Sequence, residues 1–176
     1  MTRVAICLVV SQLPLLLFGQ QVVNLEENKA HAYNGLEYSY YISNESSKEV
    51  KGEDYVRFEL NLIVTNNSGC LKIMPFKTGS TGNTGYETDI MIAEFNCTNA
   101  TGKRLTAKKG TVSASPWFTN VRIPDDSVKD KHRTVYAQVG YAVHNGQTVS
   151  NRIIVIVPKD ERPKVNCRII YLPEIQ

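Results

Sequence analysis

The stretch HRTVYAQVGYAVHNGQTVSNRIIVIVP, residues His132 to Pro158, decides the fold class because two β-like runs flank Asn145 and Gly146. In the first run, alternate residues are apolar, which is the period of two of a half-buried strand. These residues are Val135, Ala137, Val139, Tyr141 and Val143. The second run is apolar on both parities toward its end, so we expect both of its faces to be covered there. The stretch predicts two strands joined by a structural turn at Asn145 and Gly146.

Parity also predicts how these two strands pair. A two-residue loop would place Val139 opposite Arg152, whereas a three-residue loop of residues 144–146 would place Val135 opposite Val155. The longer loop matches apolar face to apolar face, and a slip of one residue would reverse the faces. We therefore expect a hairpin with Gly146 in the left-handed conformation and a bulge after it.

The rest of the chain adds further β-like runs and no helical period, and we expect about seven short strands in total. Outside the opening stretch the runs are 35–43, 55–65, 70–76, 87–97, 111–124 and 164–172, and the polar residues 44–54 are expected to form a connecting loop. This pattern predicts an antiparallel β-sandwich of immunoglobulin-like or fibronectin-like type, with a small β-barrel as the alternative. Trp117 follows both Cys70 and Cys97 instead of lying between a wide cysteine pair, so only the general architecture is predicted.

The chain begins with the features of a secretory signal peptide. Arg3 is followed by an apolar run that ends near Gly19, and the run is shorter than the roughly 20 residues of a spanning helix. We expect residues 1–19 to be a signal peptide, 20–34 an N-terminal arm, 35–158 the sandwich and 159–176 a linker with a last strand or docking tail. The mature chain is then secreted or periplasmic, without a transmembrane segment.

Export would leave three cysteines in an oxidising compartment. Cys70 and Cys97 flank predicted strands on either side of a glycine-rich segment, so we expect a disulfide between them. Cys167 is then left free or paired with another molecule.

Charge and motifs exclude several classes of function. The formal charge is +3, and removal of Arg3 makes it +2, which does not indicate a nucleic-acid partner. The glycine-rich residues 77–86 lack the ending of a phosphate-binding loop, and 125–131 does not have calcium-loop spacing. The histidines His31, His132 and His144 have no neighbouring nucleophile motif. We predict no enzyme activity, no metal site and no cofactor.

Aromatic residues are the best candidates for ligand contact, although most aromatics on strands pack in a core. The aromatic residues that could contact a ligand are Tyr38, Tyr40, Tyr41, Tyr86, Trp117 and Phe118, and we single out Tyr86, Trp117 and Phe118 as candidates. We expect a non-catalytic binding or interaction module with an unknown protein or carbohydrate partner. One alternative is a structural subunit that assembles through an edge strand. The other alternative is a secreted hydrolase with an unrecognised site.

Several runs resemble a family of small uncharacterised exported β-sandwich proteins of Gram-negative bacteria. These runs are TNNSGCLKIMPFK at 65–77, FNCTNATGKRLTAKKGTV at 95–112, PWF at 116–118 and GYAVHNG at 140–146. The resemblance implies export and a β-sandwich, and it implies no activity or site residue. A eukaryotic glycoprotein ectodomain is the alternative source, since Asn44, Asn66, Asn96 and Asn99 each begin an Asn-x-Ser/Thr triplet.

Overall fold

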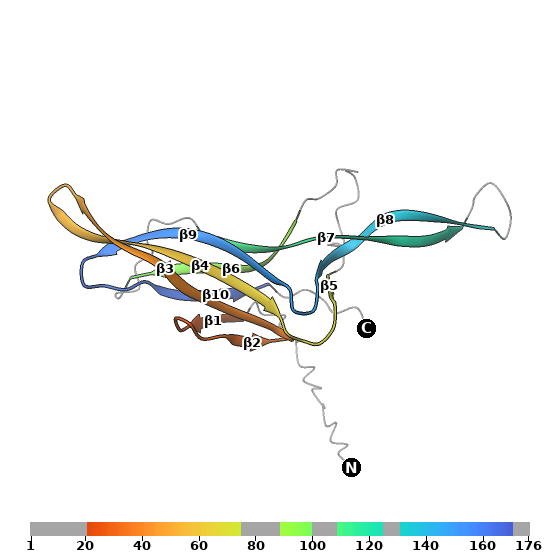
Figure 1. Ribbon diagram of the computed structural model, residues 1–176, viewed down its shortest axis with the longest axis horizontal. Coiled ribbons are helices and arrows are strands. Elements are labelled where there is room, and N and C mark those ends of the chain that lie inside the picture. The colour runs from red at the N-terminus through yellow and green to blue at the C-terminus, as the bar shows by residue number, and fades with distance from the viewer. Residues whose placement is uncertain (1–20, 75–88, 100–108, 125–130, 171–176) are drawn as a thin grey trace, which may run out of the picture.

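The fold is all-β, and the described residues contain no helix. The computed structural model describes residues 21–74, 89–99, 109–124 and 131–170. Ten strands form two antiparallel sheets that pack as a sandwich (Figure 1). The strands are β1 (Gln21–Leu25), β2 (His31–Tyr33), β3 (Leu36–Val50), β4 (Glu53–Asn66), β5 (Lys72–Met74), β6 (Ile90–Thr98), β7 (Gly110–Pro124), β8 (His132–Val143), β9 (Thr148–Pro158) and β10 (Lys164–Ile169). The predicted antiparallel all-β class is confirmed.

The two sheets have the strand orders β1-β10-β6-β7-β8-β5 and β2-β3-β4-β9. Alternation along β4 buries Phe58, Leu60, Leu62 and Val64, so the strand with the clearest period in the sequence lines the core. The facing sheet contributes buried residues from β6, β7 and β10. The largest of these are Ile90, Ile92, Phe95 and Ile169, and Val112 and Val165 pack beside them.

The chain ends are parts of the sandwich. β1 pairs with β10, and β10 pairs with β6, so β10 is an interior strand of the six-stranded sheet. Val165, Cys167 and Ile169 alternate toward the core and are buried. We expected residues 20–34 and 159–176 to lie outside the sandwich, but β1, β2 and β10 all belong to its sheets.

A longer hairpin replaces one expected loop. Residues 44–54 were predicted to connect two strands, but β3 continues to Val50 and β4 begins at Glu53. This hairpin extends beyond the sandwich at one end (Figure 1). Both of its faces meet water there, so its residues are polar and show no apolar period for a sequence pattern to detect.

The predicted pairing of the opening stretch is wrong, because β8 and β9 belong to different sheets. Val135 of β8 pairs with Val121 of β7, and Val155 of β9 pairs with Phe58 of β4. The turn does lie at residues 145–146, with Gly146 at φ 75°. It carries the chain from one sheet to the other. Parity fixes which face of each strand is apolar, and it does not distinguish a hairpin from such a crossing.

The expected cover on both faces of the second run is also wrong in part. Val155 and Val157 are buried, but Ile154 on the outer face is 46% exposed. No described strand or loop forms a further layer on this face of the four-stranded sheet, so the apolar character of the run exceeds its burial.

The predicted disulfide is wrong, since all three described cysteines are free. Cys70 is exposed in the turn before β5, whereas Cys97 and Cys167 are buried on β6 and β10. Cys167 lies opposite Phe95 and Cys97 lies opposite Val165, so the two buried thiols are diagonal neighbours. Burial raises the pKa of Cys97 to about 11 and that of Cys167 to about 12. Both thiols therefore act as small apolar core groups.

Candidate interaction site

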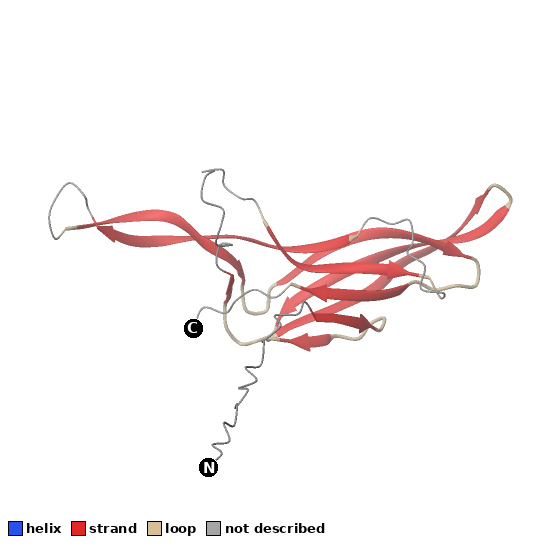
Figure 2. Cartoon of the chain, turned by 180° about the vertical axis from the view of Figure 1, so that it is seen from behind, coloured by secondary structure: helices blue, strands red, loops and turns tan. Residues whose placement is uncertain are grey.

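A two-stranded ribbon that leaves the sandwich is the most distinctive surface of the protein. It consists of Ser115–Pro124 of β7 and His132–Gly140 of β8, and we call it the arm. β6 pairs with β7 only as far as Ala114, and β5 pairs with β8 only at Tyr141–Val143. Within the described residues, both outer edges of the arm are therefore unpaired. Figures 1 and 2 show from opposite sides that the arm extends away from both sheets.

Local sequence explains why the arm departs where it does. Pro116 has no N–H to donate, and it lies where β7 has just lost its partner β6. Opposite it, the register shifts between Trp117 and Phe118, which leaves Val139 as the extra residue of a bulge. Gly140 follows with φ 156°, and a Cβ atom there would lie 2.5 Å from the carbonyl oxygen of Met74. The bulge and the glycine together set the direction of the arm.

The two faces of the arm differ in chemistry, since directly opposite residues share a face. On one face Val121 lies opposite Val135 and Thr119 lies opposite Ala137. These four side chains are only half-buried because no second layer covers them in the described structure.

The other face of the arm carries an aromatic pair. The rings of Phe118 and Tyr136 stack with centroids 5.7 Å apart and an interplanar angle of 19°. Tyr136 is 72% exposed, the largest exposed fraction among the big hydrophobic residues that the structure describes. A large ring held by a stacked neighbour loses little conformational entropy on binding, which is why such rings are frequent at interfaces.

The sequence-predicted contact residues are thus only partly brought together. Trp117 and Phe118 lie half-buried at the base of the arm, on either side of the bulge. Tyr86 lies outside the described residues. Tyr136 was missed, although its parity, opposite to that of the apolar residues of its strand, is a signal that could have found it. The remaining aromatic candidates divide between the core, where Tyr38 and Tyr40 are buried, and the outer face, where Tyr41 is 40% exposed.

The arm is anchored by the buried amide of Asn66, the last residue of β4 and itself fully buried. Its Nδ2 donates to the carbonyl oxygens of Cys70 at 2.8 Å and Val143 at 2.7 Å. Its Oδ1 accepts from the backbone N–H of Ser68 at 3.0 Å and from the Ser68 hydroxyl at 2.7 Å. Asn66 therefore joins the end of β4 to the segments that lead into β5 and out of β8.

The same residue holds the turn at residues 145–146. The N–H of Gly146 donates to the carbonyl oxygen of Asn66 at 2.7 Å, and Asn145 Oδ1 accepts from the N–H of Gly69 at 3.0 Å. The N–H of Gln147 donates to the carbonyl oxygen of His144 at 2.9 Å and closes the turn. Since Asn66 is fully buried, its Asn-x-Ser triplet is closed to glycosylation in the folded chain, whereas the Asn44 triplet is exposed.

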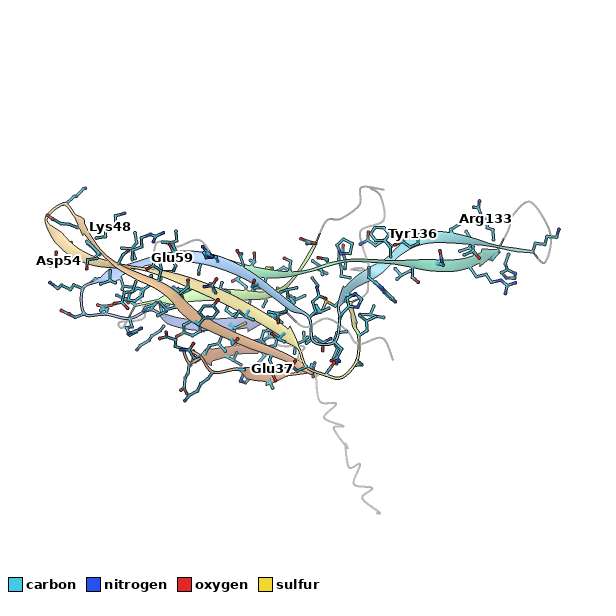
Figure 3. All side chains as sticks on the ribbon, viewed as in Figure 1. Glu37, Lys48, Asp54, Glu59, Arg133 and Tyr136 are labelled. Atoms are coloured by element: carbon cyan, nitrogen blue, oxygen red, sulfur yellow. The ribbon has the colours of Figure 1, made fainter. Side chains whose placement is uncertain are left out.

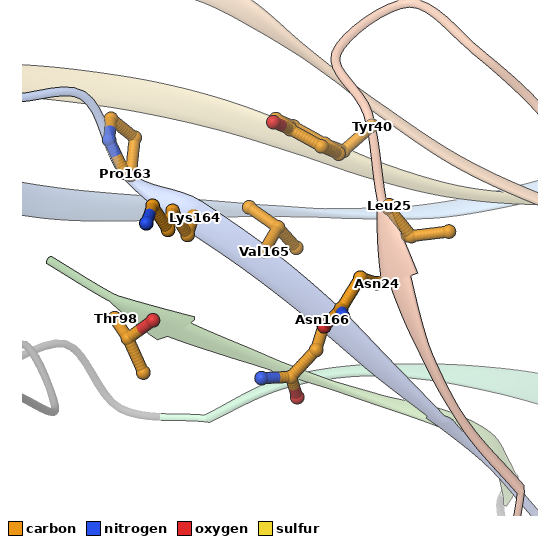
Figure 4. Close-up of a pocket in the computed structure, with 8 residues that line it drawn as sticks. All are labelled: Asn24, Leu25, Tyr40, Thr98, Pro163, Lys164, Val165 and Asn166. Atoms are coloured by element: carbon orange, nitrogen blue, oxygen red, sulfur yellow. The ribbon is translucent and has the colours of Figure 1, made fainter. Parts of the chain in front are cut away.

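A shallow cleft of about 340 Å³ opens at the edge of the sandwich (Figure 4). Asn24 lies opposite Asn166 and Lys164 lies opposite Thr98, and Leu25 and Val165 are buried at its base. Its size is at the lower end of small-molecule sites. The lining residues are Asn24, Leu25, Tyr40, Thr98, Pro163, Lys164, Val165 and Asn166. They can donate and accept hydrogen bonds, but they include no carboxylate, histidine or thiol for acid–base or nucleophilic chemistry.

The one buried carboxylate that the structure describes, Glu94 on β6, is held by two cations. Lys109 Nζ lies 2.8 Å from Oε1 of Glu94, and Arg168 Nη2 lies 2.7 Å from Oε2. Burial by itself raises the pKa of Glu94, but the hydrogen bonds from Lys109 and Asn96 and the charge of Arg168 outweigh it and lower the pKa. Glu94 is therefore ionised, and it ties β6 to β10 and to Lys109, the residue before β7.

The candidate general bases do not form a site. His31 lies on β2, His132 lies at the far end of the arm and His144 lies in the turn after β8. Within the described ranges, no three side chains of His, Cys, Asp or Glu gather closely enough to hold a metal ion.

Comparison of the chain with protein-family models, curated proteins and solved structures found no match. In the part of the chain that the structure covers, no helix has the length and apolarity needed to cross a membrane.

Proposed function

We propose that the chain is an exported, non-catalytic interaction module that binds a partner protein through the arm. The observation that carries this proposal is a ribbon that no other described strand pairs along its length and that displays the stacked pair Phe118 and Tyr136. A two-stranded ribbon without a covering layer is marginally stable in water by itself. A partner that covers the arm would stabilise it.

A protein partner suits the arm better than a carbohydrate. The free N–H and C=O groups along the edges match those of another extended chain, which is the basis of strand addition. Phe118 and Tyr136 stack on each other, so one face of each ring is already covered and is not available to a sugar. A sugar partner is retained as an outcome of the test.

The non-catalytic assignment rests on the distribution of reactive groups. The three histidines lie on separate elements, and the cleft lining includes no carboxylate, histidine or thiol that could activate Thr98 or Lys164 as a nucleophile. We therefore favour a binding module over the alternative of a secreted hydrolase.

Export, and with it a secreted or periplasmic location, is part of the proposal. It is supported by the charged start and apolar run of residues 1–19 in the sequence, which lie outside the described residues. Membership of the Gram-negative exported family, and an immunoglobulin-like or fibronectin-like assignment of the sandwich, are proposed on the same footing. The two packed antiparallel sheets are compatible with that assignment.

Site-specific photo-cross-linking in the producing cell tests the proposed function. A photoreactive phenylalanine analogue is placed at Tyr136 and, as the matched control, at Arg152 on the outer face of β9, whose side chain is 67% exposed. We expect one discrete protein adduct from position 136 and none from position 152. We also expect Phe118→Ala to abolish the adduct without lowering the melting temperature by more than a few degrees.

Two results would overturn the proposal. One is an identical set of adducts from both positions. The other is the lack of any adduct at position 136, together with Tyr136-dependent binding of the purified chain on a glycan array, which would identify a carbohydrate module instead.

A further inference from the structure

We infer that the partner of the arm is a second copy of this chain, bound head to tail. In this arrangement the free edge of β8 in the arm pairs with the free edge of β3 at the opposite end of the next molecule. The inference rests on the proposed function of the arm and specifies its partner.

The acceptor is the hairpin at the other end of the molecule, residues 44–54, which we call the hairpin tip. β2 pairs with β3 only at Leu36–Tyr38, and the N–H of Asn28 donates to the carbonyl oxygen of Tyr40. Beyond Tyr40, no described residue pairs with the outer edge of β3. Figure 1 shows the hairpin tip and the arm at opposite ends of the long axis.

Among the edge strands, β8 and β3 are the best suited to pair between molecules. β7 in the arm contains Pro116 and Pro124, which have no N–H to donate to an added strand. Residues 132–140 and 43–50 contain no proline, so no position along these two edges lacks an N–H group. The edge strands β1, β2 and β5 are short, from 3 to 5 residues. The longer edge strand β9 lies against β7 of the facing sheet, where the Asn151 side chain donates to the carbonyl oxygen of Thr111, and it ends at Pro158.

The charges of the two ends are opposite. The arm carries Arg122 and Arg133 and no carboxylate, which gives +2 for 115–124 with 132–140. The adjacent Lys131 makes this +3, and residues 125–130, which lie outside the described part, contain Asp125, Asp126, Lys129 and Asp130 and reduce the sum to +1. The net positive charge of the arm therefore lies on its two strands, and the residues 125–130 that join them carry its carboxylates.

The hairpin tip is acidic. Its four carboxylates, Glu45, Glu49, Glu53 and Asp54, outnumber Lys48 and Lys51, and four minus two leaves a charge of −2. The neighbouring residues 159–162 contain two cations and two carboxylates and do not change this sum. Figure 3 labels Lys48 and Asp54 at this end of the molecule and Arg133 and Tyr136 at the other.

The charges on the described strands of the arm disfavour the simplest symmetric alternative. Two arms in contact would bring Arg122 and Arg133 of both copies together, and like charges across a contact are destabilising. A contact between arm and hairpin tip joins opposite charges instead. Because these surfaces lie at opposite ends of one chain, the contact is heterologous and repeats into an open linear assembly.

The contact is small, since a single strand edge buries less than the roughly 1,200 to 2,000 Å² of a stable specific interface. We therefore expect association at about 0.1 to 1 mM protein. It should weaken when the Debye length falls from about 30 Å at 0.01 M salt to about 3 Å at 1 M.

Sedimentation velocity of the purified exported chain provides the first test. We expect the weight-average mass to rise at least twofold above the monomer mass over this concentration range at low salt, and to return to it at high salt. A monomer at every concentration and salt overturns the inference.

A charge exchange provides the second test. The arm variant Arg122→Glu/Arg133→Glu and the tip variant Glu49→Lys/Glu53→Lys should each stay monomeric alone. Their equimolar mixture should associate again, because each arm then meets a tip of opposite sign. The matched control Lys29→Glu/Arg152→Glu reverses two exposed charges away from both surfaces and should associate like the unaltered chain. Association of either single variant as strong as that of the unaltered chain, or no association in the mixture, overturns the inference.

The identity of the protein cross-linked to position 136 distinguishes this inference from the proposed function. An adduct of twice the chain mass, lost in the tip variant, supports head-to-tail pairing. An adduct with a different protein, from a chain that sediments as a monomer, leaves the arm as a binding site and overturns the second copy as its partner.

Discussion

The side-chain amide of Asn66 donates a 2.7 Å hydrogen bond to the carbonyl oxygen of Val143, 77 residues further along the chain. Through this bond the last residue of β4 holds the end of β8, which belongs to the other sheet. All of the hydrogen-bonding groups of the Asn66 side chain are used, because two donors and two accepted bonds are present. The arm is positioned by a polar contact inside an otherwise apolar core.

Replacement of Asn66 with Ala should therefore be strongly destabilising. It leaves the buried carbonyl oxygen of Val143 without this donor and removes one of the two side-chain donors to the carbonyl oxygen of Cys70, and we expect a loss of about 2 to 4 kcal/mol in the free energy of unfolding. Urea denaturation measures it, with Asn67→Ala as the control, since Asn67 is exposed and bonds through its backbone. Equal losses in the two variants would contradict the role of the Asn66 amide.

Two glycines near the arm should respond differently to replacement with Ala. At Gly146 a Cβ atom would meet nothing within 4 Å, so only the left-handed conformation is penalised, by about 1 to 2 kcal/mol. At Gly140 it would lie 2.5 Å from the carbonyl oxygen of Met74, so β5 must move as well. We expect the melting temperature to fall further for Gly140→Ala than for Gly146→Ala, and the reverse order would show that β5 does not constrain the bulge.

The cysteines should differ in reactivity. Burial raises the pKa of Cys97 to about 11 and that of Cys167 to about 12, so neither forms a thiolate near pH 8. Peptide mapping after iodoacetamide treatment of the native chain should find Cys70 modified and the other two unmodified. All three should react in denaturant. A native disulfide between any two of them would contradict this arrangement.

The ion cluster at Glu94 predicts a pH dependence of stability. The pKa of Glu94 is lowered in the folded chain, so its stabilising contribution is complete above the ordinary value of 4.5 and is lost as the pH falls through the lowered pKa. Glu94→Gln should cost about 1 to 3 kcal/mol at pH 7 because Lys109 and Arg168 lose their charged partner. Chemical denaturation at pH 7 and pH 3 should show this difference shrinking at the lower pH. A difference independent of pH would assign the loss to packing alone.

Backbone exchange should separate the arm from the sandwich. Amides of the arm are bonded across a single ribbon with two open edges, whereas β4 lies between β3 and β9. Hydrogen–deuterium exchange should therefore be faster in residues 117–123 and 133–138 than in Phe58–Val64, because local opening of the arm does not require the core to unfold. Equal protection in the free monomer would indicate that the arm is covered.

Sequence patterns identified the strands that line the core. Residues 55–65 and 164–172 were both predicted to form strands, and in both the alternate apolar residues, such as Phe58 and Val165, are buried because a period of two places them on one face. The Asn-Gly pair predicted the turn and the conformation of Gly146. Of the contact candidates, Phe118 was recognised, but its stacking partner Tyr136 was not. The parity of Tyr136 places it on the face opposite to the apolar residues of its strand, and only the tertiary structure shows that this face stays in water.

The sequence by itself determined the all-β class, the core faces and the turn, since these depend on the local chemistry of neighbouring residues. Tertiary structure alone decided that β8 and β9 separate into different sheets, that β10 lies inside one of them and that the cysteines do not pair. Partner choice between strands depends on contacts such as that of Asn66 with Val143, which join residues far apart in the chain. A run in which every second residue is apolar can lie under a second sheet or extend into solvent as an arm. The alternation shows which face of the strand is apolar, and it carries no information about what covers that face.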